Sequence, residues 1–176
     1  MDDLVVRIKD IFCTIRVLEE KDIEDLLIVK NEIETHKERL ELQKEGKACY
    51  LGAVINNCVI GFVLISFDNK KDVMPYTNNN ICADMIDLFV MKPFRGQGIG
   101  THLIAQSEII CKDNKISYLG LDVNPKDNSG AMRLYERLSY VKVGELHLDG
   151  VYPSKDENGN DCEYEDWCID MIKRLN

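Results

Sequence analysis

The pattern of hydrophobic and polar positions along the chain predicts strands and helices in alternation. Residues 11–17 (IFCTIRV) are apolar and β-branched and predict a strand, while apolar residues at helical spacing between Ile23 and Gly46 predict one amphipathic helix or two. Two apolar runs follow, at 48–55 and 58–67, and Asn56-Asn57 joins them. Because Asn tolerates the positive φ that a tight turn requires, these two runs predict a β-hairpin.

The second half of the chain continues this alternation. The polar segment 68–80 contains Pro75 and four asparagines, and it is expected to form a long connection that can move as a flap. The pattern then predicts strand, helix, strand, helix and a closing antiparallel pair of strands, at 81–91, 99–112, 116–123, 128–138, and 140–148 with 162–173. Asp127 or Asn128 is the expected N-cap of the last helix. These elements predict one α/β domain over residues 1–176.

Composition and charge exclude several classes of protein. At 176 residues, 45% of them hydrophobic, the chain has the size and composition of a globular domain with its own core. No window approaches the roughly 20 apolar residues of a membrane span. Met1-Asp2-Asp3 is acidic where a signal peptide is basic, so a cytoplasmic location is expected. The net charge of −9 disfavours nucleic acid as a partner and permits attraction of cationic small molecules.

Acidic residues are concentrated near the C-terminal end of the sequence. Between Asp149 and Asp166, seven carboxylates stand against Lys155 alone. This segment is expected to form an acidic loop between the closing strands. Such a loop would either pair with a polycation or serve only to keep the protein in solution.

Cysteine and histidine positions argue against a disulfide framework and against a metal site. The cysteines are odd in number, scattered and without a C-x-x-C pair, and most lie in apolar runs, where a thiol behaves as a small hydrophobe. His36, His102 and His147 are far apart in the sequence and have no metal-ligand spacing. No metal is therefore expected.

A glycine-rich loop between a strand and a helix is the strongest chemical signal. It runs from Arg95 to Gly100 (RGQGIG), after the strand at 81–91 and a stop at Pro93. Glycines allow backbone N–H groups to approach a ligand, and a helix N-terminus adds partial positive charge, so the loop predicts a phosphate or pyrophosphate site. It lacks the Lys of a Walker A loop, and its glycine spacing differs from the dinucleotide fingerprint.

The loop and the elements around it resemble the GNAT superfamily of N-acetyltransferases. Arg95, Gly98 and Gly100 match the family's R-x-x-G-x-G pyrophosphate motif, and Val90 and Pro93 precede it as in the family. A second strand ends in Asn124, and the family pattern N-x-x-A-x-x-L-Y is matched by Asn128, Ala131, Leu134 and Tyr135. Ser139 stands where the family usually has Gly, at a helix C-cap. The resemblance covers 81–143 closely, and it implies a mixed, mostly antiparallel central sheet flanked by helices.

The resemblance also implies an acetyl-CoA-dependent enzyme and roles for particular residues. Tyr135 matches the family tyrosine that protonates the leaving thiolate, and a backbone N–H near Val90 is expected to stabilise the oxyanion. Asp84 stands where several family members place a catalytic carboxylate and is the expected base. Asp87 and a water chain are alternatives, although strand alternation places Asp87 on the opposite face unless a bulge intervenes. The residues expected to bind acetyl-CoA are Phe89, Val90, Arg95, Gly96, Gln97, Gly98, Ile99, Gly100, Thr101, Asn124, Asn128 and Tyr135.

The acceptor remains open at this level. A small cationic amine, such as a polyamine, an aminoglycoside or an amino sugar, agrees with the acidic segment. A protein N-terminus or a lysine side chain is the second possibility, and a module that binds acyl-CoA without catalysis is the third. Tyr135 argues against the third, because a binding module needs no acid for a thiolate. Neither nucleic acid nor a membrane is expected as a partner, and the protein is expected to be a monomer or a homodimer.

Overall fold

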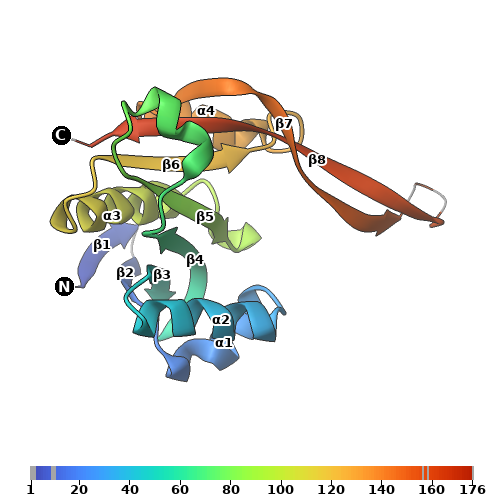
Figure 1. The fold of residues 1–176 in the computed structure, drawn as a ribbon. Coiled ribbons are helices and arrows are strands. Elements are labelled where there is room, and N and C mark those ends of the chain that lie inside the picture. The colour runs from blue at the N-terminus through green and yellow to red at the C-terminus, as the bar shows by residue number, and fades with distance from the viewer. Residues whose placement is uncertain (1–2, 9–10, 156, 158, 176) are drawn as a thin grey trace.

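The strands pair into one eight-stranded sheet with helices on both faces (Figure 1). The computed structural model describes residues 3–8, 11–155, 157 and 159–175. The strand order is β1-β2-β3-β4-β5-β6-β8-β7, and only β5 and β6 run parallel, so the sheet is mixed and mostly antiparallel, as the resemblance implied. The strands are β1 (Leu4–Ile8), β2 (Ile11–Val17), β3 (Ala48–Ile55), β4 (Cys58–Ser66), β5 (Cys82–Val90), β6 (Tyr118–Val123), β7 (Val141–Lys155) and β8 (Asp161–Arg174).

Helices cover the two faces of the sheet from different parts of the chain. They are α1 (Ile23–Val29), α2 (Ile33–Lys44), α3 (Ile99–Asp113) and α4 (Ser129–Arg137), with short 3-10 turns η1 (Glu20–Asp22), η2 (Lys71–Tyr76) and η3 (Lys92–Phe94). Leu26 and Leu40 of α1 and α2 pack on one face with Phe62. Leu103 of α3 packs on the other face with Met85. No helix in the described part of the chain is long and apolar enough to span a membrane.

Most elements predicted from the sequence are confirmed. β3 and β4 form the predicted hairpin, and Asn56 and Asn57 adopt φ of 50° and 64°, as the tight turn requires. The helical segment at 23–46 forms two helices. The sequence pattern does not predict β1, which pairs antiparallel with β2 and is only five residues long.

The polar segment 68–80 is packed against the sheet rather than open. Val73 and Thr77 in this segment are fully buried, and the Thr77 hydroxyl donates a hydrogen bond to the Asn80 carbonyl at 2.8 Å. The Lys70 N–H donates to the Cys82 carbonyl at 2.9 Å, so the segment is tied to the start of β5. The segment therefore holds the side chain of Lys70 over the sheet instead of forming the free flap expected from its composition.

The expected acidic loop is the outer part of a long hairpin. β7 and β8 continue past the rest of the sheet as a two-stranded ribbon, which we call the arm and define as residues 146–155 and 161–168 (Figure 1). Pairs from Val151–Glu165 to Lys155–Asp161 place most of the acidic segment in strands, so the prediction of a loop was wrong. The sequence misled because charged residues in an exposed ribbon lack the apolar alternation of a half-buried strand.

Candidate functional site

The candidate site lies where β5 and β6 separate from each other. These parallel neighbours pair only from Cys82–Tyr118 to Asp84–Gly120. Beyond Asp84 the two strands diverge, and residues 85–90 and 121–123 do not pair with one another (Figure 1). We call this opening the wedge. Backbone groups along its sides have lost their partner strand, so a ligand can take up their hydrogen bonds.

A β-bulge in β5 lies beside the wedge. Two β5 residues, Asp87 and Leu88, face the single β4 residue Val63, and Asp87 adopts φ of 52°. An extra residue of this kind bends the strand and increases its twist. The bulge thus occurs in the stretch where β5 leaves β6.

Val90 directs its backbone N–H into the wedge. The Met91 N–H donates to the Ile60 carbonyl at 2.9 Å, and Val90 is paired with Gly61 one position earlier. Hydrogen-bonded and non-hydrogen-bonded pairs alternate along an antiparallel ladder, so the N–H and C=O of Val90 point away from β4. This orientation agrees with the oxyanion role expected for that N–H group.

The glycine-rich loop leads directly into α3. Gly96 and Gly98 adopt φ of 72° and 87°, which other residues rarely tolerate, and Gly98 is the N-cap of α3. No side chain in the described residues caps this helix, and its first turn carries no acidic residue. The N–H groups of the first turn have no intrahelical acceptor, so with the helix dipole they form a site for an anion. The loop fits a pyrophosphate.

Arg95 connects this loop to the end of β5. Its Nε donates to the Val90 carbonyl at 2.7 Å, and its guanidinium lies 5.3 Å from the centre of the Phe89 ring. The residue is otherwise exposed, so its terminal nitrogens are accessible to a phosphate. Phe89 therefore contributes a side-chain contact to Arg95 as well as the backbone contacts predicted for it.

Tyr135 lies close to the same convergence of elements. A methyl group added at Gly100 would lie 3.8 Å from Leu134 and 4.0 Å from Leu88, so α3, α4 and β5 meet at the start of α3. Tyr135 is 7% exposed, and its hydroxyl has no hydrogen-bond partner among the described residues. Burial raises the pKa of Tyr135 to about 12, so the hydroxyl keeps its proton at neutral pH, as an acid must.

The remaining residues predicted to bind acetyl-CoA differ in what they offer. Asn124 Oδ1 accepts hydrogen bonds from the backbone N–H groups of Lys126 and Asp127, each at 3.0 Å. Its Nδ2 donates to the Tyr164 hydroxyl at 2.8 Å and to the Asp166 carboxylate at 2.7 Å. It therefore holds the turn between β6 and α4. Asn128 is the exposed N-cap of α4 and makes no side-chain cap.

Three loop residues complete the set. The Gln97 amide donates to the Pro93 carbonyl at 3.1 Å, which fixes the turn before α3. The side chain of Ile99 is only 1% exposed, so this residue offers its backbone alone to a ligand. Thr101 is half-buried in the first turn of α3.

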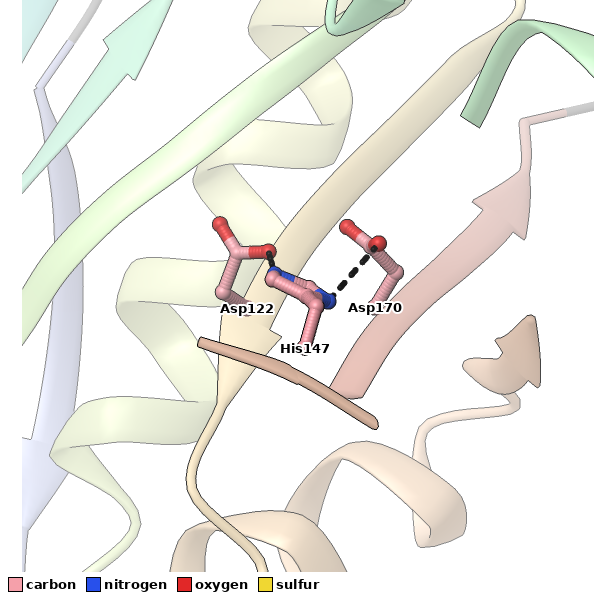
Figure 2. A group of neighbouring side chains, drawn as sticks. All are labelled: Asp122, His147 and Asp170. Atoms are coloured by element: carbon pink, nitrogen blue, oxygen red, sulfur yellow. Dashed lines mark ion pairs between the residues drawn. The ribbon is translucent and has the colours of Figure 1, made fainter. Parts of the chain in front are cut away.

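Three aspartates surround Lys70 on the face of the sheet that carries α1 and α2. The Lys70 ammonium lies 2.7 Å from Asp122 Oδ2, 3.2 Å from Asp170 Oδ1 and 3.7 Å from Asp84 Oδ1. The His147 ring lies between Asp122 and Asp170 (Figure 2). Its Nε2 is 3.7 Å from the Asp122 carboxylate, and its Nδ1 is 3.7 Å from the Asp170 carboxylate. We call these five residues the aspartate cluster. Asp84 belongs to the last pair before the strands diverge, so the cluster adjoins the closed end of the wedge.

The environment of the cluster changes the proton affinity of its members. Burial raises the pKa of Asp84 to about 6, and Asp122 and Asp170 add to this effect while Lys70 opposes it. For Lys70, burial favours the neutral amine, but the surrounding carboxylates outweigh burial and raise its pKa. At neutral pH Asp84 is thus an ionised carboxylate that gains a proton more readily than an ordinary aspartate.

Asp87 has the opposite character. Its Oδ2 accepts hydrogen bonds from Arg39 Nη2 at 2.8 Å and from Lys30 Nζ at 3.1 Å. Burial would raise the pKa of Asp87, but Arg39, assisted by Lys30, outweighs burial and lowers it. The bulge turns Asp87 toward α1 and α2, and a carboxylate engaged by two cations is a poor base.

Sequence spacing gave no indication of most of the aspartate cluster. Lys70, Asp122, His147 and Asp170 come from four different segments, whereas spacing rules find ligands that are close in sequence. Atoms of Asp122, His147 and Asp170 lie within 4.8 Å of one another, which is close enough to hold a metal ion. The Lys70 ammonium already supplies positive charge to two of these carboxylates.

Comparison with known protein families finds a match for the part of the chain that contains the wedge. The model of the acetyltransferase (GNAT) family matches residues 15–140. That range includes the glycine-rich loop, α3 and α4, and it ends before β7 and β8. A search among curated protein sequences finds no match.

Solved structures with the same fold match over most of the chain. Arabidopsis thaliana NAA60 in complex with a bisubstrate analogue has a TM-score of 0.70 at 19% identity, over 93% of this chain and 98% of that one. The Salmonella typhimurium yncA structure with acetyl-CoA has a TM-score of 0.69 at 14% identity, over 93% and 94%. The Escherichia coli ribosomal-protein-S18-alanine N-acetyltransferase has a TM-score of 0.67 at 15% identity, over 93% and 94%. At these identities the likeness establishes the fold alone.

Proposed function

The chain belongs to the GNAT family of acetyl-CoA-dependent acetyltransferases, and from that premise we propose that it acetylates a primary amine on a small cationic acceptor. A polyamine, an aminoglycoside and an amino sugar are acceptors of this kind. The observation that carries the proposal is the aspartate cluster at the closed end of the wedge. Three carboxylates around one ammonium favour a cation there, and Asp84 among them has the proton affinity of a base that works near neutral pH.

In this proposal the chain supplies a group for each requirement of the transfer. Acetyl-CoA supplies the thioester. The first turn of α3 and Arg95 hold the pyrophosphate of its CoA part. The Val90 N–H donates to the carbonyl oxygen as negative charge develops on it. Asp84 lies six residues before Val90 on β5, so it is the final acceptor of the proton that the attacking amine loses, which reaches it through intervening water. Tyr135 donates a proton to the departing sulfur.

A polypeptide amine is the second candidate, and the arm favours it. The arm includes the acidic segment, but five of its large apolar side chains are 41–51% exposed. These five are Leu146, Leu148, Val151, Tyr152 and Trp167. A polypeptide could lie along such a surface and contact these side chains, whereas a small amine is too short to cover them. The fold is shared with a ribosomal-protein N-acetyltransferase. A thiol-release assay with acetyl-CoA across a panel of polyamines, aminoglycosides, amino sugars and peptides separates the two candidates.

Acetyl-CoA is expected to raise the melting temperature of the protein. Ligand at a hundred times its dissociation constant stabilises the folded state by about 2.7 kcal/mol. For a chain of this size that corresponds to a rise of about 5–10 °C. Circular dichroism melting with and without acetyl-CoA measures the shift, and no shift at millimolar acetyl-CoA would remove the basis of the proposal.

Thr101→Asp tests whether the start of α3 is the binding site. An acidic residue in the first turn of a helix interacts favourably with the helix dipole. Without acetyl-CoA, the variant should therefore melt at or above the wild-type temperature. The same carboxylate would repel a pyrophosphate. The shift caused by acetyl-CoA is therefore expected to fall to less than half, and a full shift would place the pyrophosphate elsewhere.

Acidic residues of the arm are expected to attract a cationic acceptor. Glu163→Gln together with Glu165→Gln removes two exposed charges and leaves Asp166, which accepts the Asn124 amide, in place. With spermidine as acceptor, KM should rise about 3–10-fold at low salt, and the difference should shrink in 1 M NaCl, where the Debye length is about 3 Å. Glu38→Gln with Glu41→Gln on the exposed side of α2 is the matched control. Equal KM values at every salt concentration would mean that the arm charges serve only solubility.

A further inference from the structure

The bulge at Asp87 is a strained conformation that the rest of β5 does not require. A non-glycine residue with φ of 52° is in the left-handed region, which Asp tolerates better than most residues but still at a cost. Gly61 on β4 accommodates the bulged strand, because a Cβ at that position would lie 2.6 Å from the Phe89 carbonyl oxygen. Without a restraint, β5 would relax toward a regular strand, which could pair further along β6 and narrow the wedge.

Arg39 of α2 supplies the restraint on Asp87. Its guanidinium donates from Nη2 to Asp87 at 2.8 Å, and the Arg39 side chain is only 9% exposed. Its Cζ lies 5.6 Å from the ring centres of both Tyr50 and Phe62, which fix its position. Lys30 adds a second contact from the link between α1 and α2, at 3.1 Å. A buried Arg fixed on two aromatic rings holds its carboxylate in one place.

The same contacts continue to the atoms expected to act on the thioester. Phe62 stacks on Phe89 with ring centres 5.9 Å apart, and the Arg95 guanidinium in turn contacts the Phe89 ring. Arg95 binds the Val90 carbonyl, on the same residue whose N–H faces the wedge. A continuous set of contacts thus runs from Arg39 through Phe62, Phe89 and Arg95 to the Val90 carbonyl.

We propose that the Arg39–Asp87 ion pair positions the Val90 N–H for the thioester oxygen by holding β5 in its bulged course. Both are positioning residues, since they act on the reaction through the backbone of β5. This inference rests on the proposed function, because it takes Val90 as the donor to the thioester. Loss of the pair should therefore reduce turnover while leaving the pyrophosphate site intact.

Three variants test the pair by kinetics with the best amine of the panel. Asp87→Ala and Arg39→Met are expected to lower kcat about 10–100-fold, because misplacing a donor by about 1 Å costs on that order. KM for acetyl-CoA should stay within about threefold, since the loop is unchanged. Asp87→Asn should keep kcat within about fivefold, because Asn tolerates positive φ and can still accept the Arg39 N–H.

The Arg16–Asp22 pair provides the matched control. It is a two-bond ion pair at 2.7 and 2.8 Å, with side chains 18% and 6% exposed, and it joins β2 to the turn before α1 rather than to β5. Arg16→Met should lower the melting temperature and leave kcat unchanged. If Asp87→Ala and Arg39→Met lower only the melting temperature, as this control does, the pair is merely structural and the inference is wrong.

Amide NMR gives a readout that needs no acceptor and tolerates loss of stability. On titration with acetyl-CoA, the amides of Gly98, Gly100 and Val90 should shift in the wild type and in Asp87→Asn. In Arg39→Met the two glycine amides should still shift, whereas the Val90 amide should not. A Val90 response that survives in Arg39→Met overturns the positioning role. If no glycine amide responds in the wild type, the proposed function itself fails, which is a different result.

Discussion

Asp84→Asn is expected to lower the rate of acetyl transfer by about 10²–10⁴-fold at pH 8, the range typical for loss of a general base. The carboxylate lies at the closed end of the wedge, and its pKa of about 6 leaves it ionised at that pH. In the wild type, activity should therefore rise as pH increases through about 6 and then level off with respect to this group. The Asn variant should lose that rise, which pH profiles of kcat/KM in a thiol-release assay would measure.

The same variant is expected to be more stable than the wild type at pH 8. The folded-state pKa of Asp84 is raised above its ordinary value of 3.8, so its ionised form is disfavoured in the folded protein. The stability associated with the protonated form is fully present below pH 3.8 and is lost as pH rises through about 6. Asn carries no such charge, so we expect a gain on the order of 1–3 kcal/mol in the free energy of unfolding.

Asp122→Asn separates the base from its neighbours in the aspartate cluster. Asp122 contacts the Lys70 ammonium at 2.7 Å, as a neighbour of Asp84 in the cluster. Loss of the Asp122 charge should leave Asp84 in place as the base and change the affinity for the acceptor amine. If Asp84→Asn kept activity within threefold and Asp122→Asn abolished it, the role of base would pass to Asp122.

Tyr135→Phe is expected to lower kcat about 100-fold or more, because the departing thiolate would lose its proton donor. The change removes one oxygen atom from a buried ring whose hydroxyl makes no hydrogen bond within the described protein, so the fold should tolerate it. Affinity for acetyl-CoA should remain close to that of the wild type. Kinetics and calorimetric titration on the same samples measure the two quantities.

Tyr140→Phe is the control for this substitution. Its ring lies 5.9 Å from that of Tyr135 and is also buried, but its hydroxyl donates to Glu108 of α3 at 3.2 Å. Loss of that bond should cost stability and leave kcat unchanged. Equal turnover by Tyr135→Phe and the wild type would show that water or another group protonates the sulfur.

Local signals in the sequence account for the parts of the structure that were predicted. The turn at Asn56-Asn57 and the glycine loop before α3 each depend on the conformational preferences of adjacent residues, which a single sequence displays. The same holds at Ser139, which follows the C-cap of α4 and adopts φ of 69°, a conformation that the glycine usual in the family adopts more readily.

Features that depend on distant contacts were not predicted. Asp87 reads as an ordinary alternating strand residue, and its turn toward Arg39, 48 positions away, follows from a bulge that no local pattern announces. Lys70 lies in a segment whose polar composition indicates a loop, yet burial of Val73 holds that segment on the sheet. The aspartate cluster therefore required the tertiary structure to assemble it.

The arm affects how unfolding of this protein should be followed. Trp167 is the only tryptophan in the chain, and it lies in the arm, 41% exposed and bonded to Glu165. A two-stranded ribbon is marginally stable by itself in water, so the arm can open locally before the sheet does. Intrinsic tryptophan fluorescence would then report an early transition confined to the arm, while far-ultraviolet circular dichroism would report the later cooperative loss of the core.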